Sequence, residues 1–192
     1  MSEIEQQLLG VLSSLSFRKG DFTLVSGAKS NYYIDGKMSE VNPKGAYLIG
    51  EVLFNRIRQL GVDAIGGLAV GAVPLVTATV ISSHHHRQPI EGFWVRDEVK
   101  SHGTKKLIEG GLKPGSRVVI VDDVITKGGS SLKAVNAVRE SGCEVVLVLA
   151  LVDRLAGARE LFAENGITNF EAVFTIREFG VEVPDNSSAV AN

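Results

Sequence analysis

The chain has 192 residues, which is enough for one domain with a sizeable core. Its formal net charge of −2 argues against a general nucleic-acid binder, because such proteins need a broad positive potential. The single cysteine, Cys143, excludes an internal disulfide, and an acidic start without a long apolar stretch predicts a cytoplasmic protein with no membrane or nucleic-acid partner.

The first predicted elements are a helix and a small flap. Apolar residues at helical spacing predict an amphipathic helix over residues 4–14. A two-stranded or looped flap follows through residue 35, with residues 32–34 as its strand-like part. We expect a single domain, in which residues 1–42 form a helix and hood, residues 43–180 an α/β core, and residues 181–192 a loose, polar tail.

Helices and strands alternate along the expected core. Asn42 and Pro43 start a helix whose buried stripe reaches Leu60 and which Gly61 ends. Apolar runs separated by helical patterns predict an α/β fold with a doubly wound, mainly parallel sheet. The predicted strands are residues 63–67, 92–95, 117–123, 144–152 and 170–175, and the further helices run from the 66–74 turn to about 83, over 130–140 and over 155–164.

The segment 118–131 is the most informative part of the chain. Four consecutive β-branched residues predict a central parallel strand, and ligands bind at the carboxyl edge of such sheets. Asp122 and Asp123 follow, and paired carboxylates suit the hydroxyls of a ribose, directly or near a bound Mg2+. The next turn offers amides, hydroxyls and one cation to a phosphate at a helix N-terminus, through Thr126, Lys127, Gly128, Gly129 and Ser130.

Other interpretations of this segment are weaker. The glycine patterns of the Walker loop and of the Rossmann dinucleotide site are both absent, so a sugar phosphate is favoured over a nucleoside triphosphate or a dinucleotide. The remaining alternative is that the two aspartates only cap the next helix.

Residues 118–131 resemble the ribose-5-phosphate motif of the type I phosphoribosyltransferases, which is a hydrophobic run, two acids and a Thr- and Gly-rich turn. Residues 22–35, 96–103 and 151–154 narrow the resemblance to the orotate branch of that family. The resemblance implies Mg2+-dependent transfer of ribose 5-phosphate from 5-phosphoribosyl 1-diphosphate to orotate, giving orotidine 5'-phosphate and pyrophosphate in pyrimidine (UMP) biosynthesis. The Mg2+ would be held mainly through substrate oxygens.

A basic segment over residues 96–106 lies between two predicted strands. On composition alone it could be a solvated loop. In the family that it resembles, this loop crosses a twofold interface into the partner's active site, which implies a homodimer. Cations there would neutralise the departing pyrophosphate, and Asp97 stands where relatives usually have lysine. The resemblance assigns the catalytic roles to Arg96, Lys100, His102, Asp122 and Asp123.

The orotate itself would be bound by two parts of the chain. Arg154 follows a continuous apolar strand and would clamp the orotate carboxylate, unless it only pairs with Asp153 or Glu178. The flap resembles the hood that covers the pyrimidine. Backbone groups around Tyr33 and Ile34 would read the base, although these could also be ordinary strand residues.

Two lysines expected from the family are missing near the substrate. Many relatives have a lysine at the position of Val25, and Lys29 is our candidate substitute. Residues 66–74 resemble the pyrophosphate loop, where Val70 and Gly71 replace a lysine, so that backbone amides would hold the diphosphate. A plain turn between a strand and a helix is the alternative.

Three other features are predicted to have no catalytic role. His84, His85 and His86 are adjacent, so their side chains diverge and cannot face one ion; we expect them on a surface loop after a helix. Cys143 is expected to be small and buried, and Trp94 to be a core or interface residue.

Two rival functions use the same motifs. One is a phosphoribosyltransferase for another base, such as a purine, which Arg154 and the hood oppose. The other is a non-catalytic regulatory homologue that binds nucleic acid, which the basic segment and the lack of a basic face oppose.

Overall fold

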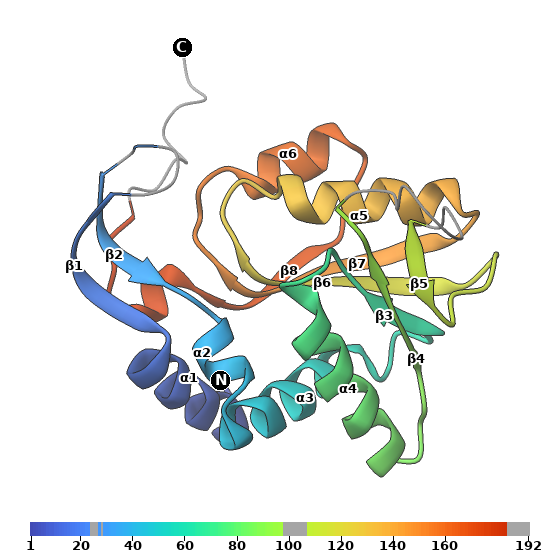
Figure 1. Ribbon diagram of the computed structural model, residues 1–192, viewed down its shortest axis with the longest axis horizontal. Helices are drawn as coiled ribbons and strands as arrows, with labels where there is room; N and C mark the ends of the chain where they lie inside the picture. The colour runs from blue at the N-terminus through green and yellow to red at the C-terminus, as the bar shows by residue number, and fades with distance from the viewer. Residues whose placement is uncertain (24–26, 28, 98–106, 184–192) are drawn as a thin grey trace.

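The computed structural model describes residues 1–23, 27, 29–97 and 107–183. Within these ranges a six-stranded sheet forms the centre of the molecule, with the strand order β5-β4-β3-β6-β7-β8 (Figure 1). All neighbouring strands are parallel except β4 and β5, which confirms the mainly parallel sheet. The strands are β3 (Ala64–Gly66), β4 (Glu91–Val95), β5 (Ile108–Gly110), β6 (Arg117–Ile125), β7 (Glu144–Asp153) and β8 (Phe170–Thr175).

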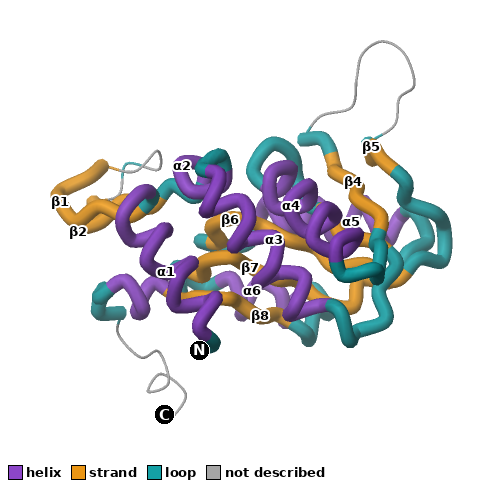
Figure 2. The backbone as a smooth tube through the Cα atoms, turned by 90° about the horizontal axis from the view of Figure 1, so that it is seen from below, coloured by secondary structure: helices purple, strands orange, loops and turns teal. Residues whose placement is uncertain are grey.

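Helices cover both faces of this sheet (Figures 1 and 2). One face carries α1 (Glu3–Leu15), α3 (Pro43–Ile57) and α4 (Ala72–His85), and the other carries α5 (Gly129–Glu140) and α6 (Ala158–Glu164). Each face of the sheet has its own hydrophobic core, and successive side chains of β6 enter the two cores alternately. Val119 and Val121 pack on the side of α1, α3 and α4, and Val118 and Ile120 on the side of α5 and α6. Burial on both faces explains why this strand shows no polar alternation.

Side-chain caps set the starts of two helices. Ser2 and Glu5 form a capping box at α1, and Asn42 accepts from the amides of Lys44 and Gly45 at α3. The prediction that the buried stripe of α3 continues to Leu60 was wrong, because the helix ends at Ile57 and Leu60 is 40% exposed. α6 begins three residues later than predicted, because the preceding Leu155 and Gly157 have left-handed backbones, with φ of 55° and 99°.

The hood is an antiparallel pair, β1 (Phe17–Thr23) and β2 (Lys29–Ile34), followed by the short helix α2 (Lys37–Glu40). Its base is fixed to the core by aromatic packing, since the Phe17 ring lies 5.3 Å from that of Phe179 in η1 (Ile176–Phe179). Val181 beyond η1 is buried, so the expected loose tail does not begin at residue 181; residues 184–192 lie outside the described ranges. None of the helices in the described part of the chain has the length and apolar composition needed to cross a membrane.

Candidate active site at the carboxyl edge of the sheet

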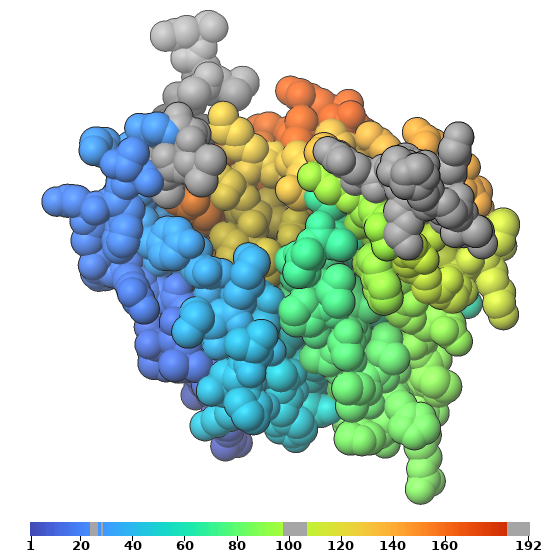
Figure 3. All heavy atoms as spheres, viewed as in Figure 1, coloured from blue at the N-terminus to red at the C-terminus, as the bar shows by residue number. Residues whose placement is uncertain are grey.

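The predicted site lies where the connections of the sheet diverge. β3 and β6 are parallel neighbours, yet the chain leaves β3 toward α4 on one face and leaves β6 toward α5 on the other. Such a switch point opens a crevice at the carboxyl ends of the strands, which is where open α/β sheets bind ligands. Figure 3 shows the hood, the turn after β3 and the turn after β6 on one face of the molecule.

The two acids lie within β6, and their side chains follow its alternation. Asp122, which is 9% exposed, points toward α5 and accepts a hydrogen bond from the Ser131 hydroxyl at 2.7 Å. Its Oδ1 also accepts from the Asp123 amide at 3.1 Å. Burial raises the pKa of Asp122 to about 6, the Ser131 hydroxyl opposes this, and the charge of Asp123 adds to it. Ser131, the last residue of the predicted segment 118–131, thus uses its hydroxyl to bind one of the two acids.

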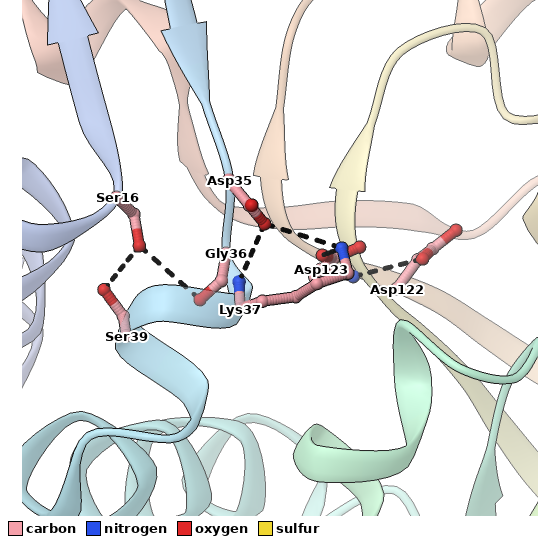
Figure 4. A network of polar contacts seen from close by, with 7 residues as sticks. All are labelled: Ser16, Asp35, Gly36, Lys37, Ser39, Asp122 and Asp123. Atoms are coloured by element: carbon pink, nitrogen blue, oxygen red, sulfur yellow. Dashed lines mark hydrogen bonds and ion pairs between the residues drawn. The ribbon is translucent and has the colours of Figure 1, made fainter.

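Asp123, which is 8% exposed, faces the opposite side, toward the hood (Figure 4). Its Oδ2 lies 3.4 Å from Nζ of Lys37, which is 3.5 Å from Oδ1 of Asp35. Burial alone would lower the pKa of Lys37, but the charges of Asp123 and Asp35 raise it. Lys37 is thus a cation at the acid pair that sequence reasoning missed.

Two glycines lie directly against the acids. A Cβ atom added to Gly36 would lie 3.2 Å from Oδ2 of Asp123, and one added to Gly71 would lie 3.1 Å from its Oδ1 and 3.7 Å from Oδ1 of Asp122. The predicted residue Gly71 therefore lies next to both carboxylates. The position beside Gly36 is also closed by Oε1 of Glu40, which would lie 2.5 Å from the added Cβ, so a side chain does not fit there.

The turn before Gly71 is fixed to β4 by backbone hydrogen bonds. The Ala69 amide donates to the Val95 carbonyl at 2.7 Å, and the Val95 amide donates to the Gly67 carbonyl at 2.8 Å. The peptide bond between Ala69 and Val70 is cis, and Val70 is 75% exposed. Of the two predicted residues, Gly71 thus lies beside the acid pair, and Val70 before it is exposed.

The turn after β6 has the form expected of a phosphate cradle. The first bond within α5 runs from the Leu132 amide to the Gly128 carbonyl, and no described side chain caps the helix. The amides of residues 129–131 therefore remain for a ligand. Gly128 has φ of 80°, and a Cβ there would lie 2.7 Å from the Phe162 ring. A Cβ on Gly129 would meet nothing within 4 Å; the neighbouring Thr126 is half-buried, while Lys127 and Ser130 are exposed.

Arg154 joins the core to the hood. Its amide donates to the Ile125 carbonyl at 2.9 Å, and its Nε donates to the Tyr32 hydroxyl at 3.0 Å. Its guanidinium also lies 4.8 Å from the centre of the Tyr32 ring. The alternative, an ion pair of Arg154 with Asp153 or Glu178, is wrong for the described residues. Asp153 accepts a hydrogen bond from the Leu155 amide, and Glu178 accepts one from the Thr175 hydroxyl.

The other predicted hood residues have local contacts. Tyr33 is exposed, and its ring lies 5.6 Å from that of Phe22, whereas Ile34 is buried in the core. Lys29 donates to the Thr23 hydroxyl at 2.9 Å. Roles of Lys29, Tyr33 and Ile34 in binding the base stay predictions.

The basic segment is described only at its start. Nε of Arg96 donates to Glu109 at 3.1 Å, and Oδ1 of Asp97 lies 2.7 Å from Nζ of Lys133. Asp97, at the family's lysine position, thus pairs with α5. Lys100 and His102 lie outside the described residues.

The three histidines, Cys143 and Trp94 have contacts away from the acid pair, as predicted, but two of the predicted locations are wrong. Contrary to prediction, His84 and His85 belong to the last turn of α4 rather than to a loop, and His86 contacts Glu51 at 2.9 Å. Cys143 is buried, and its thiol lies 3.1 Å from the Lys113 carbonyl. Trp94 on β4 is partly exposed and is not a core residue; its place in an interface stays a prediction.

Comparisons with known proteins point to one family. Residues 38–184 match the family model described as the phosphoribosyl transferase domain. An orotate phosphoribosyltransferase from Rhodopirellula baltica is 44% identical over 181 residues, covering 91% of this chain and 93% of that protein. The crystal structure of the Mycobacterium tuberculosis orotate phosphoribosyltransferase with Fe(III) dicitrate matches with a TM-score of 0.82 at 35% identity, over 93% of this chain and 99% of that one. Its complex with 5-phospho-α-D-ribosyl 1-diphosphate matches with a TM-score of 0.78 at 33% identity, with the same coverage of both chains.

Proposed function

Because this chain belongs to the orotate phosphoribosyltransferases, a family of enzymes, we propose that it transfers ribose 5-phosphate from 5-phosphoribosyl 1-diphosphate to N1 of orotate. The products are orotidine 5'-phosphate and pyrophosphate, in pyrimidine (UMP) biosynthesis. The observation that carries the proposal is the buried acid pair at the end of β6, next to an uncapped helix N-terminus. We also propose a cytoplasmic location, which the buried free thiol of Cys143 supports.

The sugar phosphate would lie across the turn after β6. Asp122 and Asp123 would accept hydrogen bonds from the ribose hydroxyls on the side of Gly71, which lies next to both carboxylates. The amides of residues 129–131, with Thr126, Lys127 and Ser130 around them, would bind the 5-phosphate. The Mycobacterium tuberculosis relative was crystallised with this sugar diphosphate, which supports it as the substrate.

Orotate would lie between the hood and Arg154. Its carboxylate suits a guanidinium, and the contact with Tyr32 holds Arg154 at the junction of hood and core. Purines lack this carboxylate, so Arg154 is the residue that favours orotate over a purine.

The chemistry requires charge neutralisation more than acid or base catalysis. As the bond to pyrophosphate breaks, the ribose develops oxocarbenium character and the leaving oxygens gain negative charge. Bound orotate is already anionic at N1, so no strong general base is needed. Lys100 and His102 would neutralise the leaving group, and the acid pair would lie near the positive ribose.

The reaction implies a magnesium ion. Mg2+ is usually held by one or two carboxylates together with substrate phosphates. We propose that the ion is held mainly by diphosphate and ribose oxygens. Within the described ranges, no three His, Cys, Asp or Glu side chains lie close enough together to hold one. Such an ion, when bound, would help to neutralise the diphosphate.

We further propose a homodimer in which residues 96–102 of one subunit reach the site of the other. An exposed apolar surface supports it: Tyr47 of α3 and Ile81 of α4 line one groove, and Met38 and Val41 are exposed at α2. α2, α3 and α4 lie together on the face seen in Figure 3. Exposed apolar surface of this kind favours contact with a second subunit.

The test is a spectroscopic assay. The purified protein is mixed with 5-phosphoribosyl 1-diphosphate, Mg2+ and orotate, and the ultraviolet absorbance of orotate is followed. We expect orotate to be consumed and pyrophosphate to be released together, with no reaction when adenine or hypoxanthine replaces orotate. Turnover of a purine but not of orotate would contradict the proposal.

A further inference from the structure

A carboxyl group that the proposed reaction does not use lies beside the acid pair. Glu40, the last residue of α2, is only 4% exposed. Neither of its carboxyl oxygens has a hydrogen-bond partner among the described residues. An unpaired buried carboxylate is costly, so such a group is expected to be neutral or to have a specific task.

The backbone around Glu40 holds it in place. Its amide donates to the Gly36 carbonyl at 3.0 Å. The hydroxyls of Ser39, in α2, and Ser16, at the start of the hood, lie 2.6 Å apart (Figure 4). On the other side, α3 packs directly against Ser39, since a Cβ on Gly45 would collide with the Ser39 carbonyl. The backbone of α2 at Glu40 is therefore held between the hood and α3.

That carboxyl points toward Asp123. A Cβ atom on Gly36 would lie 2.5 Å from Oε1 of Glu40 and 3.2 Å from Oδ2 of Asp123, so both oxygens border the same small space. The other charged groups that face Glu40 are Lys37 on its own helix and Asp35 at the end of the hood. Asp122 precedes Asp123 on β6, and its carboxylate points to the other face of the sheet, toward Ser131.

This setting determines the charge of Glu40. Burial first, and then the negative charge of Asp123, raise the pKa of Glu40 to about 8, although Lys37 opposes them. At neutral pH Glu40 therefore carries a proton, and a protonated carboxyl is a hydrogen-bond donor. Two carboxyl groups this close share one charge more readily than they hold two.

We propose that Glu40 is a positioning residue for the ribose site, whose proton leaves the negative charge of the pair on Asp123 and so keeps that carboxylate ready to accept the ribose hydroxyls. The inference rests on the proposed function, because it assigns Glu40 to binding of the sugar diphosphate. When Glu40 loses this proton, a second negative charge appears beside Asp123. The anionic sugar diphosphate is then repelled, and Asp123 loses its neutral neighbour.

The test is the pH dependence of KM for 5-phosphoribosyl 1-diphosphate, at saturating orotate and Mg2+. At pH 9, one unit above the pKa, about one molecule in ten keeps the proton, so we expect KM to be about tenfold higher than at pH 7. Glu40→Gln keeps the shape and a donor but cannot ionise, so its KM should lack this rise. Glu171→Gln, on an exposed carboxyl of β8, is the matched control and should behave as the wild type.

The outcomes separate the two proposals. Wild type that does not consume orotate contradicts the proposed function. In that case the role of Glu40 is tested by binding instead: the affinity for ribose 5-phosphate is measured by calorimetry at pH 7 and 9 in wild type and Glu40→Gln. An equal pH dependence of sugar binding in wild type and Glu40→Gln overturns the inference, since a merely structural role would change stability but not this profile. If Glu40→Gln does not fold, an NMR titration of isotope-labelled glutamate carboxyls in the wild type decides: one must titrate near pH 8, and none doing so overturns the inference.

Discussion

At the scale of single residues, the buried Glu40 links the chemistry of the site to the stability of the fold. Its pKa is raised from 4.5 to about 8, so the folded state binds its proton more tightly than the unfolded state. The stability that this proton contributes is fully present below about pH 4.5 and is lost as the pH rises toward 8. A neutral amide at this position would not show that loss.

We therefore expect the free energy of unfolding of Glu40→Gln, relative to wild type, to increase with pH. Between about pH 5 and 8 the difference should grow by at most about 1.4 kcal/mol per pH unit. Urea unfolding of both proteins at several pH values measures it. Asp122, whose pKa is raised to about 6, titrates in both proteins, so the comparison isolates Glu40. A difference that stays constant with pH would contradict the prediction.

Arg154 gives a second prediction for a single residue. Arg154→Lys keeps the charge but loses the planar fork and the hydrogen bond to Tyr32. A bidentate contact with a carboxylate is worth about 2 kcal/mol, so we expect KM for orotate to rise about thirtyfold and KM for the sugar diphosphate to change little.

Arg159→Lys is the matched control for this change. The Arg159 guanidinium also lies over an aromatic ring, at 5.1 Å from the centre of Phe170, but on the helix α6. Its substitution should leave both KM values unaltered. Equal effects of the two substitutions on KM for orotate would show that Arg154 does not bind the carboxylate.

At the scale of elements, the turn between β6 and α5 depends on two adjacent glycines for different reasons. Gly128 has a positive φ and no room for a Cβ beside Phe162, so Gly128→Ala should lower the free energy of unfolding by about 1–3 kcal/mol. Gly129 is helical, and its Cβ would enter open space. Gly129→Ala should therefore fold with wild-type stability but raise KM for the sugar diphosphate, because the methyl group occupies the space of the phosphate.

Chemical unfolding and steady-state kinetics of both glycine variants measure these effects. Normal sugar binding in Gly129→Ala would contradict the position of the phosphate. A wild-type unfolding free energy in Gly128→Ala would contradict the explanation of its backbone.

The sequence predicted the long elements well, because strong local patterns specify them. β6 and β8 begin where the apolar runs predicted, and the acid pair was found because it directly follows such a run. The short elements α2 and β5 were missed, since four or three residues carry too little pattern. Lys37 and Glu40 were missed with α2: they meet Asp123 only through the folded chain, across more than eighty positions of sequence.

Arg154 is an intermediate case. Its position after β7 and its chemistry could be predicted from the resemblance, but its partner could not. Besides the substrate carboxylate, the sequence offered only an ion pair with a nearby acid, whereas the folded hood brings the Tyr32 hydroxyl to Arg154 from 122 positions away. Contacts between the hood and the core follow from how the hood docks on the core, which local patterns do not encode.

At the scale of the whole molecule, the proposed dimer predicts that two inactive variants restore each other's activity. Lys100→Ala removes a catalytic cation of the crossing segment, and Asp123→Asn removes an acid of the ribose site. If the segment acts on the neighbouring subunit, a mixed dimer contains one intact site, built from the acids of one subunit and the segment of the other. The second site of that dimer carries both changes.

Random exchange of subunits in an equal mixture should therefore restore about one quarter of the wild-type sites, whereas each variant alone stays inactive. The mixture is passed through mild denaturation and refolding, and the absorbance assay follows its recovery; each variant treated in the same way alone is the control. Recovery near one quarter, with dimers in sedimentation, fits a segment that crosses the interface. Dimers without any recovery would mean that residues 96–102 serve the site of their own subunit, and monomers that retain wild-type turnover would contradict the dimer itself.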